Sequence, residues 1–374
     1  MHRGAGLVCA GLLLFLLLPG GGSDARWSGP ADRIDDAAFW RLFSELSEPG
    51  GAFRSDNLVS NERGFPSVLP GIMQRASGAG AYVGVGPEQN FSYLAALRPR
   101  IAFIVDIRRE NAILHLLYKS IFELSPSRAE FLSRLFSRPR PRHLGTQSGA
   151  RDLFEAYAVV PPSADLFEEH VGEARSHLAE KHHFALGKED FEALRGVYSA
   201  FFESGPDLSY STRAFRRGRP FPSYAELMTA TDDQGIPRSF LANEENYLAL
   251  RELQRRNLII PVVGDFAGNK ALTGIAARLR ERRLTVTVFY ASNVEFYLFR
   301  SDGWSRFYGN LAALPVDGRS VLVRSIFRGF GMGYPGTGMA GRLQLDPIED
   351  LVRAFRQGEI SGYADLLERR GVFP

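Results

Sequence analysis

A tight glycine turn between two apolar runs constrains the fold of this chain more than any other feature. Residues 81–83 are apolar and lead into the glycine turn at residues 84–86, and a helical pattern follows over residues 89–97. A second apolar run, residues 101–105, ends on Asp106, about twenty residues after the turn. This order of strand, glycine turn, helix, strand and acid is typical of a mononucleotide-binding βαβ unit, in which the helix N-terminus faces the ligand and the acid accepts hydrogen bonds from ribose hydroxyls.

Strand and helix patterns alternate again in the last third of the chain. Apolar runs predict strands over residues 258–263, 284–290 and 320–326, and apolar periodicity predicts helices over residues 244–256, 268–282 and 347–357. Strands that alternate with helices form parallel sheets covered on both faces. The sequence therefore predicts an α/β fold, a three-layer, Rossmann-like, mostly parallel sheet with a helical insertion.

Changes in pattern divide the chain into five segments. The central block has mostly helical patterns, so we expect it to interrupt the sheet domain. The expected segments are a signal peptide at 1–25, an N-terminal helical lead-in at 26–80, the first half of a Rossmann-like domain at 81–125, a mainly helical insertion at 126–235 and the second half of the Rossmann-like domain at 236–374.

The start of the chain predicts a secretory signal peptide. His2 and Arg3 form a basic start, and the apolar stretch over residues 5–18 is shorter than the ~20 residues of a membrane span. Cleavage after Ala25 would export the protein to the periplasm or the cell exterior, an uncleaved segment would anchor it in the membrane, and a misassigned start codon is the third interpretation. Cleavage would also remove Cys9, the only cysteine, which argues against a disulfide-stapled scaffold.

Polar residues follow four predicted strands at the point where each strand ends. In a parallel sheet these ends meet at one edge, where ligands of open α/β sheets bind. Candidate cofactor-binding residues are Gly84, Gly86, Glu88, Gln89, Asn90, Asp106 and Arg108, and candidate substrate-binding residues are Asp265, Asn269, Tyr290, Ser292 and Asn293.

Several of these residues also have a purely structural interpretation. The glycines can form a plain tight turn. Asp106 can pair with Arg108 or Arg109 instead of a ligand. Asp265 and Asn293 can each cap the helix that follows it.

The overall charge argues against a nucleic-acid-binding protein. The 374 residues have a formal net charge of only +3, which provides no strong field for nucleic acid or for a membrane surface. The polar strand ends instead favour a small-molecule ligand. We expect no nucleic acid and no membrane contact beyond the N-terminal signal segment, and the oligomeric state is left open.

Three stretches carry a family resemblance: GVGPEQNFSYLAALRPRIAFIVDIRREN at 84–111, NLIIPVVGDFAGNKAL at 257–272 and TVFYASNVEFYLF at 287–299. They resemble an uncharacterised bacterial protein family that is described as class I S-adenosylmethionine methyltransferase-like, from about residue 30 to the C-terminus. The resemblance implies a Rossmann-like fold with a cofactor pocket at Gly84, Gly86 and Asp106.

The leading functional hypothesis is accordingly a methyltransferase-like protein that binds S-adenosylmethionine or a related nucleoside. The glycine turn and the helix start at Gln89 would hold the methionine part of the cofactor, and Asp106 would hold the ribose. Asp265 or Asn293 would contact the methyl acceptor, whose identity is unknown. In-line methyl transfer depends mainly on proximity and orientation, so no catalytic residue is assigned.

Two positions depart from the methyltransferase pattern. Tyr82 stands where the usual first motif has an acid, and Glu88 replaces its third glycine. The competing hypothesis is therefore an exported, non-catalytic ligand-binding protein, which the signal peptide supports because S-adenosylmethionine is made in the cytosol. A third hypothesis is an exported hydrolase with a metal between Asp106 and Asp265.

The histidines give a weaker signal. His170, Glu173 and His177 lie at helical spacing on one face, with His182 and His183 close behind. Such a set can bind a metal ion, but we interpret it as a solvated helix face, so no metal is predicted. His115 lies in the apolar helix after Asp106, where it can either reach the pocket or belong to the core.

Overall fold

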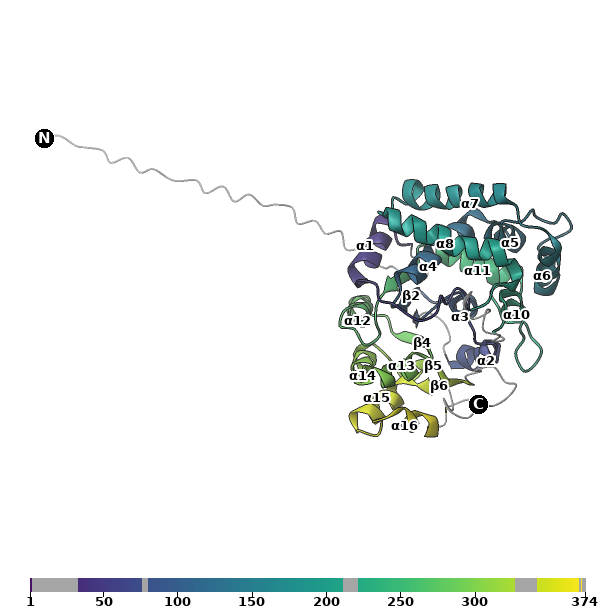
Figure 1. Ribbon diagram of the computed structural model, residues 1–374. Coiled ribbons are helices and arrows are strands. Elements are labelled where there is room, and N and C mark those ends of the chain that lie inside the picture. Colours follow the sequence, from purple (N-terminus) through teal and green to yellow (C-terminus); the bar gives the residue numbers. More distant parts are fainter. Residues whose placement is uncertain (2–32, 76–79, 211–220, 327–341, 370, 372–374) are drawn as a thin grey trace.

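The computed structural model describes Met1 and residues 33–75, 80–210, 221–326, 342–369 and 371 (Figure 1). The expected signal peptide lies outside these residues apart from Met1. Within the described part of the chain, no helix is both long and apolar enough to cross a membrane.

A six-stranded sheet forms the centre of the molecule. Its strands are β1 (Ala81–Gly84), β2 (Ile101–Asp106), β3 (Ile259–Val263), β4 (Val286–Ser292), β5 (Val321–Ile326) and β6 (Arg342–Pro347), in the order β3-β2-β1-β4-β5-β6. All neighbouring strands are parallel except β5 and β6, which are antiparallel. The structure is therefore α/β with a mostly parallel sheet, and the carboxyl ends of β1 to β5 meet at one edge.

Helices connect the strands and cover them. Those around the sheet are α1 (Asp36–Leu46), α2 (Phe65–Arg75), α3 (Gln89–Leu97), α4 (Arg109–Leu124), α11 (Glu244–Arg255), α12 (Ala271–Glu281), α13 (Val294–Arg300), α14 (Trp304–Ala313), α15 (Ile348–Arg356) and α16 (Tyr363–Glu368). Figure 1 shows α3, α4 and α11 on one side of the strands and α12, α14 and α15 on the other.

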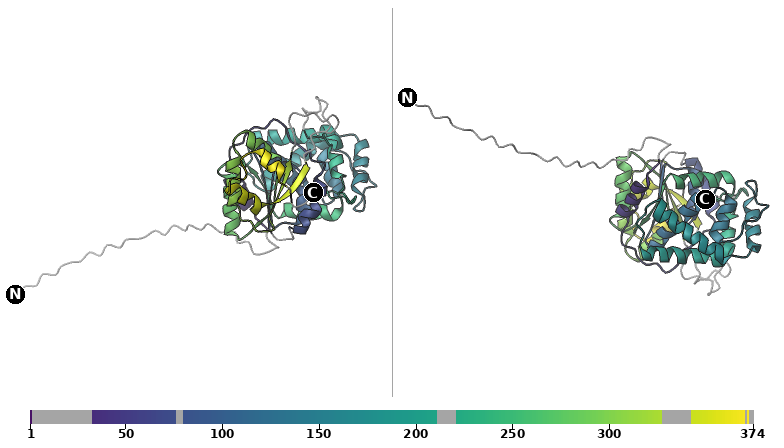
Figure 2. Two further views of the ribbon diagram at one scale, coloured as in Figure 1. Left: turned by 90° about the horizontal axis from the view of Figure 1, so that it is seen from below. Right: turned by 90° about the horizontal axis from the view of Figure 1, so that it is seen from above.

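A second group of helices lies between β2 and β3 in the chain. It consists of α5 (Arg128–Phe136), α6 (Ala150–Val159), α7 (Ala164–Ser176), the π-helical turn η1 (His177–Lys181), α8 (Lys188–Ser204), the 3-10 turn η2 (Gly205–Asp207) and α10 (Tyr224–Met228). In both views of Figure 2 these teal helices gather on one side of the molecule, away from the green and yellow C-terminal part.

The strands form because their sequences are apolar enough to be buried on both faces. Every residue of β1, β2, β3 and β5 is buried, as expected for a parallel sheet covered by helices. Pro261 has no N–H to donate, yet it lies within β3 opposite Ile104. This position is tolerated because β3 is the edge strand of the sheet.

An aromatic cluster joins α3 to α4 and to the segment before α11. The Phe91 ring on α3 makes edge-on contacts with His115, Tyr118 and Phe122 on α4, with ring centroids 5.1 to 5.5 Å apart. It makes a similar contact with Phe240, which precedes α11, at 5.6 Å. These rings bury a large apolar area, so α3 is fixed in place directly after the glycine turn.

The five strands expected from the sequence are confirmed, with ends shifted by at most two residues. The antiparallel strand β6 was not predicted, because Gln344 and Asp346 interrupt its apolar residues. Both are buried, where Asp346 accepts a hydrogen bond from the Nε of Arg324 at 2.7 Å. The arginine-rich stretch at residues 213–219 and the glycine-rich stretch at residues 329–341 lie outside the described residues.

Replacing Phe91 with alanine tests the role of the aromatic cluster. The ring is fully buried, so Phe91→Ala should lower the free energy of unfolding by about 3–5 kcal/mol through lost burial and the remaining cavity. Denaturant unfolding measures the change. Val159→Ala, at an 82% exposed position, is the control and should leave stability unchanged. Equal stability of the two variants would contradict the packing described here.

Candidate functional site

A cavity of about 230 Å³ lies at the carboxyl edge of the sheet, where the loops after β1, β2, β3 and β4 meet. Six of the residues singled out in the sequence line it together: Gly86, Asp106, Asp265, Tyr290, Ser292 and Asn293. The other six, Gly84, Glu88, Gln89, Asn90, Arg108 and Asn269, lie outside the lining. Most of this second group are buried and support the wall from behind.

The glycine turn presents its open side at Gly86. This residue has φ +76°, a conformation that favours glycine, and a Cβ added there would meet nothing within 4 Å. Gly84 has a different role, because a Cβ there would collide with the side chains of Asn90 and Tyr82. Gly84 is therefore required for packing behind the turn, and Gly86 allows backbone to line the cavity.

Asn90 and His115 hold the turn from the protein interior. The Asn90 amide donates to the carbonyls of Val85 and Pro87 at 2.9 and 2.7 Å and accepts from the Tyr82 hydroxyl at 2.8 Å. Nε2 of His115 lies 2.8 Å from the Gly86 carbonyl and donates to it. Burial lowers the pKa of His115 to about 4, so the ring is neutral near pH 7. His115 is thus a core residue that supports the turn.

Glu62, which sequence reasoning missed, positions two residues of the cavity wall. Its carboxylate accepts hydrogen bonds from the Tyr290 hydroxyl at 2.8 Å and the Ser292 hydroxyl at 2.7 Å, both at the end of β4. It also accepts from the side-chain amide of Gln89 at 2.8 Å. Burial raises the pKa of Glu62. Glu62 lies in the polar lead-in, and its local sequence carries no signal of burial.

Glu88 is fully buried behind the turn rather than exposed to a ligand. One carboxyl oxygen accepts from the Ser60 backbone N–H at 3.1 Å, and the other has no hydrogen-bond partner. Burial raises the pKa of Glu88 to about 8, so the group is mostly protonated near pH 7. Glu88 therefore contributes little negative charge to the cavity.

Asp106 makes the ion pair with Arg108 that the sequence left open, and it also lines the cavity. Oδ1 accepts from the Arg108 backbone N–H at 2.9 Å and from its Nε at 3.3 Å. The Arg108 guanidinium also donates to the carbonyls of Ser55 and Asp56. Burial raises the pKa of Asp106, and the charge of Arg108 opposes this shift. Arg108 thereby fastens the lead-in to the end of β2.

The helix-capping interpretation of Asp265 is wrong. The following helix begins at Ala271, and Asp265 Oδ1 instead accepts from the Ala267 N–H at 2.9 Å within a local turn. Asn293 does occupy the N-cap position of α13, but its side chain makes no capping hydrogen bond. Asn269 lies outside the cavity, and its carbonyl accepts from the Thr273 hydroxyl.

Acidic and aromatic side chains give the cavity its chemical character. Asp106 and Asp265 are acidic, and no lysine or arginine of the described chain lines the cavity. Rings of Phe53, Tyr210 and Tyr297 supply flat apolar surface. This combination suits a neutral or positively charged ligand with a planar ring and disfavours a phosphate.

The expected histidine face does not form one cluster. His170 lies against Ser137, with Nδ1 3.5 Å from the hydroxyl, and Glu173 pairs with Arg134. Nε2 of His177 instead lies 2.9 Å from Oε2 of Glu123, a residue that is distant from it in the chain. Helical spacing alone therefore predicted the wrong set of residues to lie together.

The chain is similar to a known protein family. A family model described as a domain of unknown function (DUF7790) matches residues 58–143 and 163–367. No curated protein matches the chain. The match includes the glycine turn and the ends of β1, β2, β3 and β4.

The buried carboxyl of Glu88 predicts a specific pH dependence of stability. Its pKa is raised from 4.5 to about 8 on folding, so between these values the folded chain keeps a proton that the unfolded chain loses. Relative to Glu88→Gln, the wild-type protein should lose up to about 1.4 kcal/mol of stability per pH unit as the pH rises through this window. Unfolding curves of both proteins from pH 5 to 8 measure this difference, and a pH-independent difference would contradict it.

Proposed function

The chain belongs to the DUF7790 family, and we propose that it is a methyltransferase-like protein that binds S-adenosylmethionine or a related nucleoside in the cavity at the carboxyl edge of the sheet. The observation that carries the proposal is the convergence of Gly86, Asp106, Asp265 and Asn293 on one cavity. These residues come from the loops after four different strands. Surface turns without a common ligand would have no reason to line one cavity together.

The strand order supports the same proposal. The order β3-β2-β1-β4-β5-β6 matches the doubly wound arrangement of a Rossmann-like sheet, with the switch point between β1 and β4. Ligands of such sheets bind beyond the carboxyl ends of the strands at this point. We therefore propose a three-layer, Rossmann-like fold in which the cavity occupies the ligand-binding crevice.

The cavity residues match the chemistry of the ligand. Asp106 would accept hydrogen bonds from ribose hydroxyls, and the backbone at Gly86 would approach the amino-acid part. An aromatic ring such as Tyr210 or Tyr297 would stack on the adenine. The positive sulfonium of the cofactor, which supplies the methyl group, suits a cavity that has acidic residues and, among the described residues, no lining lysine or arginine.

Residues at the ends of β3 and β4 would face the methyl acceptor. Tyr290 and Ser292 are held by Glu62, and Asn293 and Asp265 lie beside them in the lining. A rigid wall of this kind would orient an acceptor for in-line transfer, the step that depends most on positioning.

A second candidate is an exported protein that binds the ligand without transferring a methyl group. It is favoured by the pairing of Asp106 with Arg108, because the pair reduces the hydrogen-bonding capacity left for a ribose. If the N-terminal segment is cleaved the protein would be exported, and otherwise anchored in the membrane. Detection of binding without methyl transfer to any acceptor in extracts would favour this candidate.

Calorimetry tests the proposed ligand directly. Titration with S-adenosylmethionine, S-adenosylhomocysteine and adenosine should show binding to the purified protein. Asp106→Asn should weaken binding at least about tenfold, or about 1.4 kcal/mol, because the ribose loses a charged acceptor.

Asp165→Asn is the matched control, since Asp165 is exposed on α7 in the helical group. It should bind each ligand as the wild type does. If protein with a cooperative unfolding transition shows no heat of binding with any of the three ligands, the result would contradict the proposal.

A further inference from the structure

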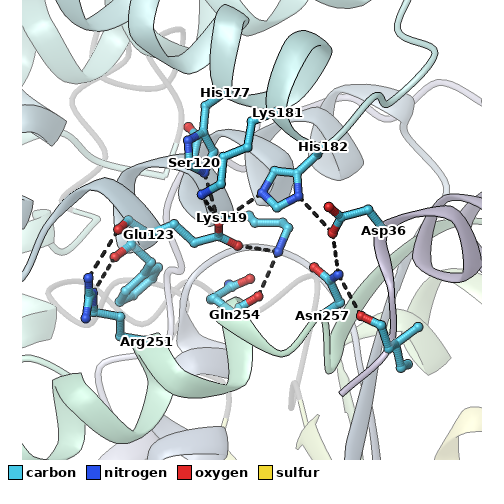
Figure 3. A network of polar contacts seen from close by, with 12 residues as sticks. Asp36, Lys119, Ser120, Glu123, His177, Lys181, His182, Arg251, Gln254 and Asn257 are labelled. Carbon is cyan, nitrogen blue, oxygen red and sulfur yellow. Dashed lines mark hydrogen bonds and ion pairs between the residues drawn. The ribbon is translucent and has the colours of Figure 1, made fainter.

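A second cluster of polar side chains lies on the flank of the sheet domain, where α1, α4 and the π-helical turn η1 meet (Figure 3). It contains Glu123 on α4, His177 on η1 and His182 directly after it. One ligand atom from each of the three lies within 4.8 Å of the others. Their side chains are only 4% to 6% exposed, so the cluster is buried.

The π-helical turn brings the two histidines together. The His182 N–H donates to the His177 carbonyl at 3.2 Å, the i to i+5 pattern of a π-helix. In a regular α-helix, side chains five residues apart point about 140° away from each other. Here Nε2 of His177 and Nε2 of His182 both lie 2.9 Å from Oε2 of Glu123. Such single π turns are frequent at functional sites.

A second carboxylate orients the His182 ring. Its Nδ1 lies 2.9 Å from Oδ1 of Asp36, the first residue of α1, while its Nε2 faces Glu123. A carboxylate on the far nitrogen of an imidazole is the usual outer partner of a metal-bound histidine. Lys119 binds the other oxygen of Glu123 and thereby fixes the orientation of that carboxylate (Figure 3).

We propose that Glu123, His177 and His182 bind one divalent transition-metal ion, with Zn²⁺ as the probe that tests it. Two imidazoles and one carboxylate are a ligand set that zinc takes in proteins, with metal–ligand distances of about 2.0–2.2 Å. The ion would lie between Oε2 of Glu123 and the two histidine Nε2 atoms that now face it. Asp36 would hold the His182 ring from behind.

With three protein ligands the ion would keep one coordination position for a water molecule, but its buried location points to a structural role. The three side chains are nearly fully buried, which leaves no room for a substrate. Along α4, Glu123 lies fourteen residues after Arg109, or about 21 Å from the helix start near the cavity. The ion would join α4 to η1 directly and to α1 through Asp36. This proposal is independent of the nucleoside proposed for the cavity.

The positive charges of two lysines near Glu123 repel a cation and limit the affinity of the site for a metal ion. Lys181 is 59% exposed, so its side chain can turn into solvent when an ion binds. Lys119 is buried and also donates to the Gln254 carbonyl at 2.7 Å, so it stays in place. We therefore expect zinc to bind more weakly than it does at an all-cysteine site.

Zinc binding to the untagged full chain is the test. After removal of metals with a chelator, equilibrium dialysis against low-micromolar ZnCl₂ should load one ion per chain. His177→Gln and His182→Gln should each abolish this binding, and Asp36→Asn should weaken it about 10- to 100-fold. The control His143→Gln changes an exposed histidine outside the cluster and should bind like the wild type.

Cobalt provides a readout that does not depend on activity or stability. Co²⁺ bound by the wild-type protein should give the visible absorption band that is typical of an ion with a low coordination number. The two histidine variants should lack this band while they keep the wild-type circular dichroism spectrum. No stoichiometric zinc in the wild type would overturn the proposal. So would wild-type binding by both histidine variants, and the cluster would then be an ion-pair network only.

Discussion

The shape of the cavity depends on hydrogen bonds that are made behind its glycine turn. Buried backbone carbonyls need donors, and the carbonyls of Val85, Gly86 and Pro87 obtain them from Asn90 and His115. Because these donors come from the interior, the opposite side of the turn stays open. The residues that line the cavity and the residues that define its shape are therefore largely different sets.

Two carboxyl groups are buried in this frame at a cost to stability. Glu62 and Glu88 both have raised pKa values because burial disfavours their charged forms. A chain selected for stability alone would place apolar residues there. Glu62 instead fixes Tyr290 and Ser292 in the cavity wall. Proteins commonly lose some stability in this way to hold the residues of a binding site in position. The lead-in that contributes Glu62 is thus part of the candidate site and not merely a cover for the sheet.

The sequence predicted the strands well because each is a short apolar run buried on both faces. It also predicted which strand ends would meet, since parallel strands leave their carboxyl ends at one edge. It did not predict β6, in which the polar Gln344 donates to Asp346 of the same strand and Asp346 accepts from Arg324 on the neighbouring strand. Nor did it predict Glu62, because burial of a carboxyl depends on partners such as Tyr290 that are distant in the chain. The sequence singled out His177 and His182 but not their partner Glu123, because Glu123 is distant in the chain and the π-helical turn breaks the periodicity from which helix faces are inferred.

The two candidate sites share a physical connection through the lead-in. Asp36, at the start of α1, contacts His182 in the histidine cluster. The segment that follows α1, residues 47–57, donates backbone hydrogen bonds to the carbonyls of Val263 and Ile107 at 2.8 and 2.7 Å, and its side chains form one wall of the cavity. Val263 is the last residue of β3, and Ile107 directly follows the end of β2. One continuous stretch of the lead-in therefore contacts both the histidine cluster and the wall of the cavity.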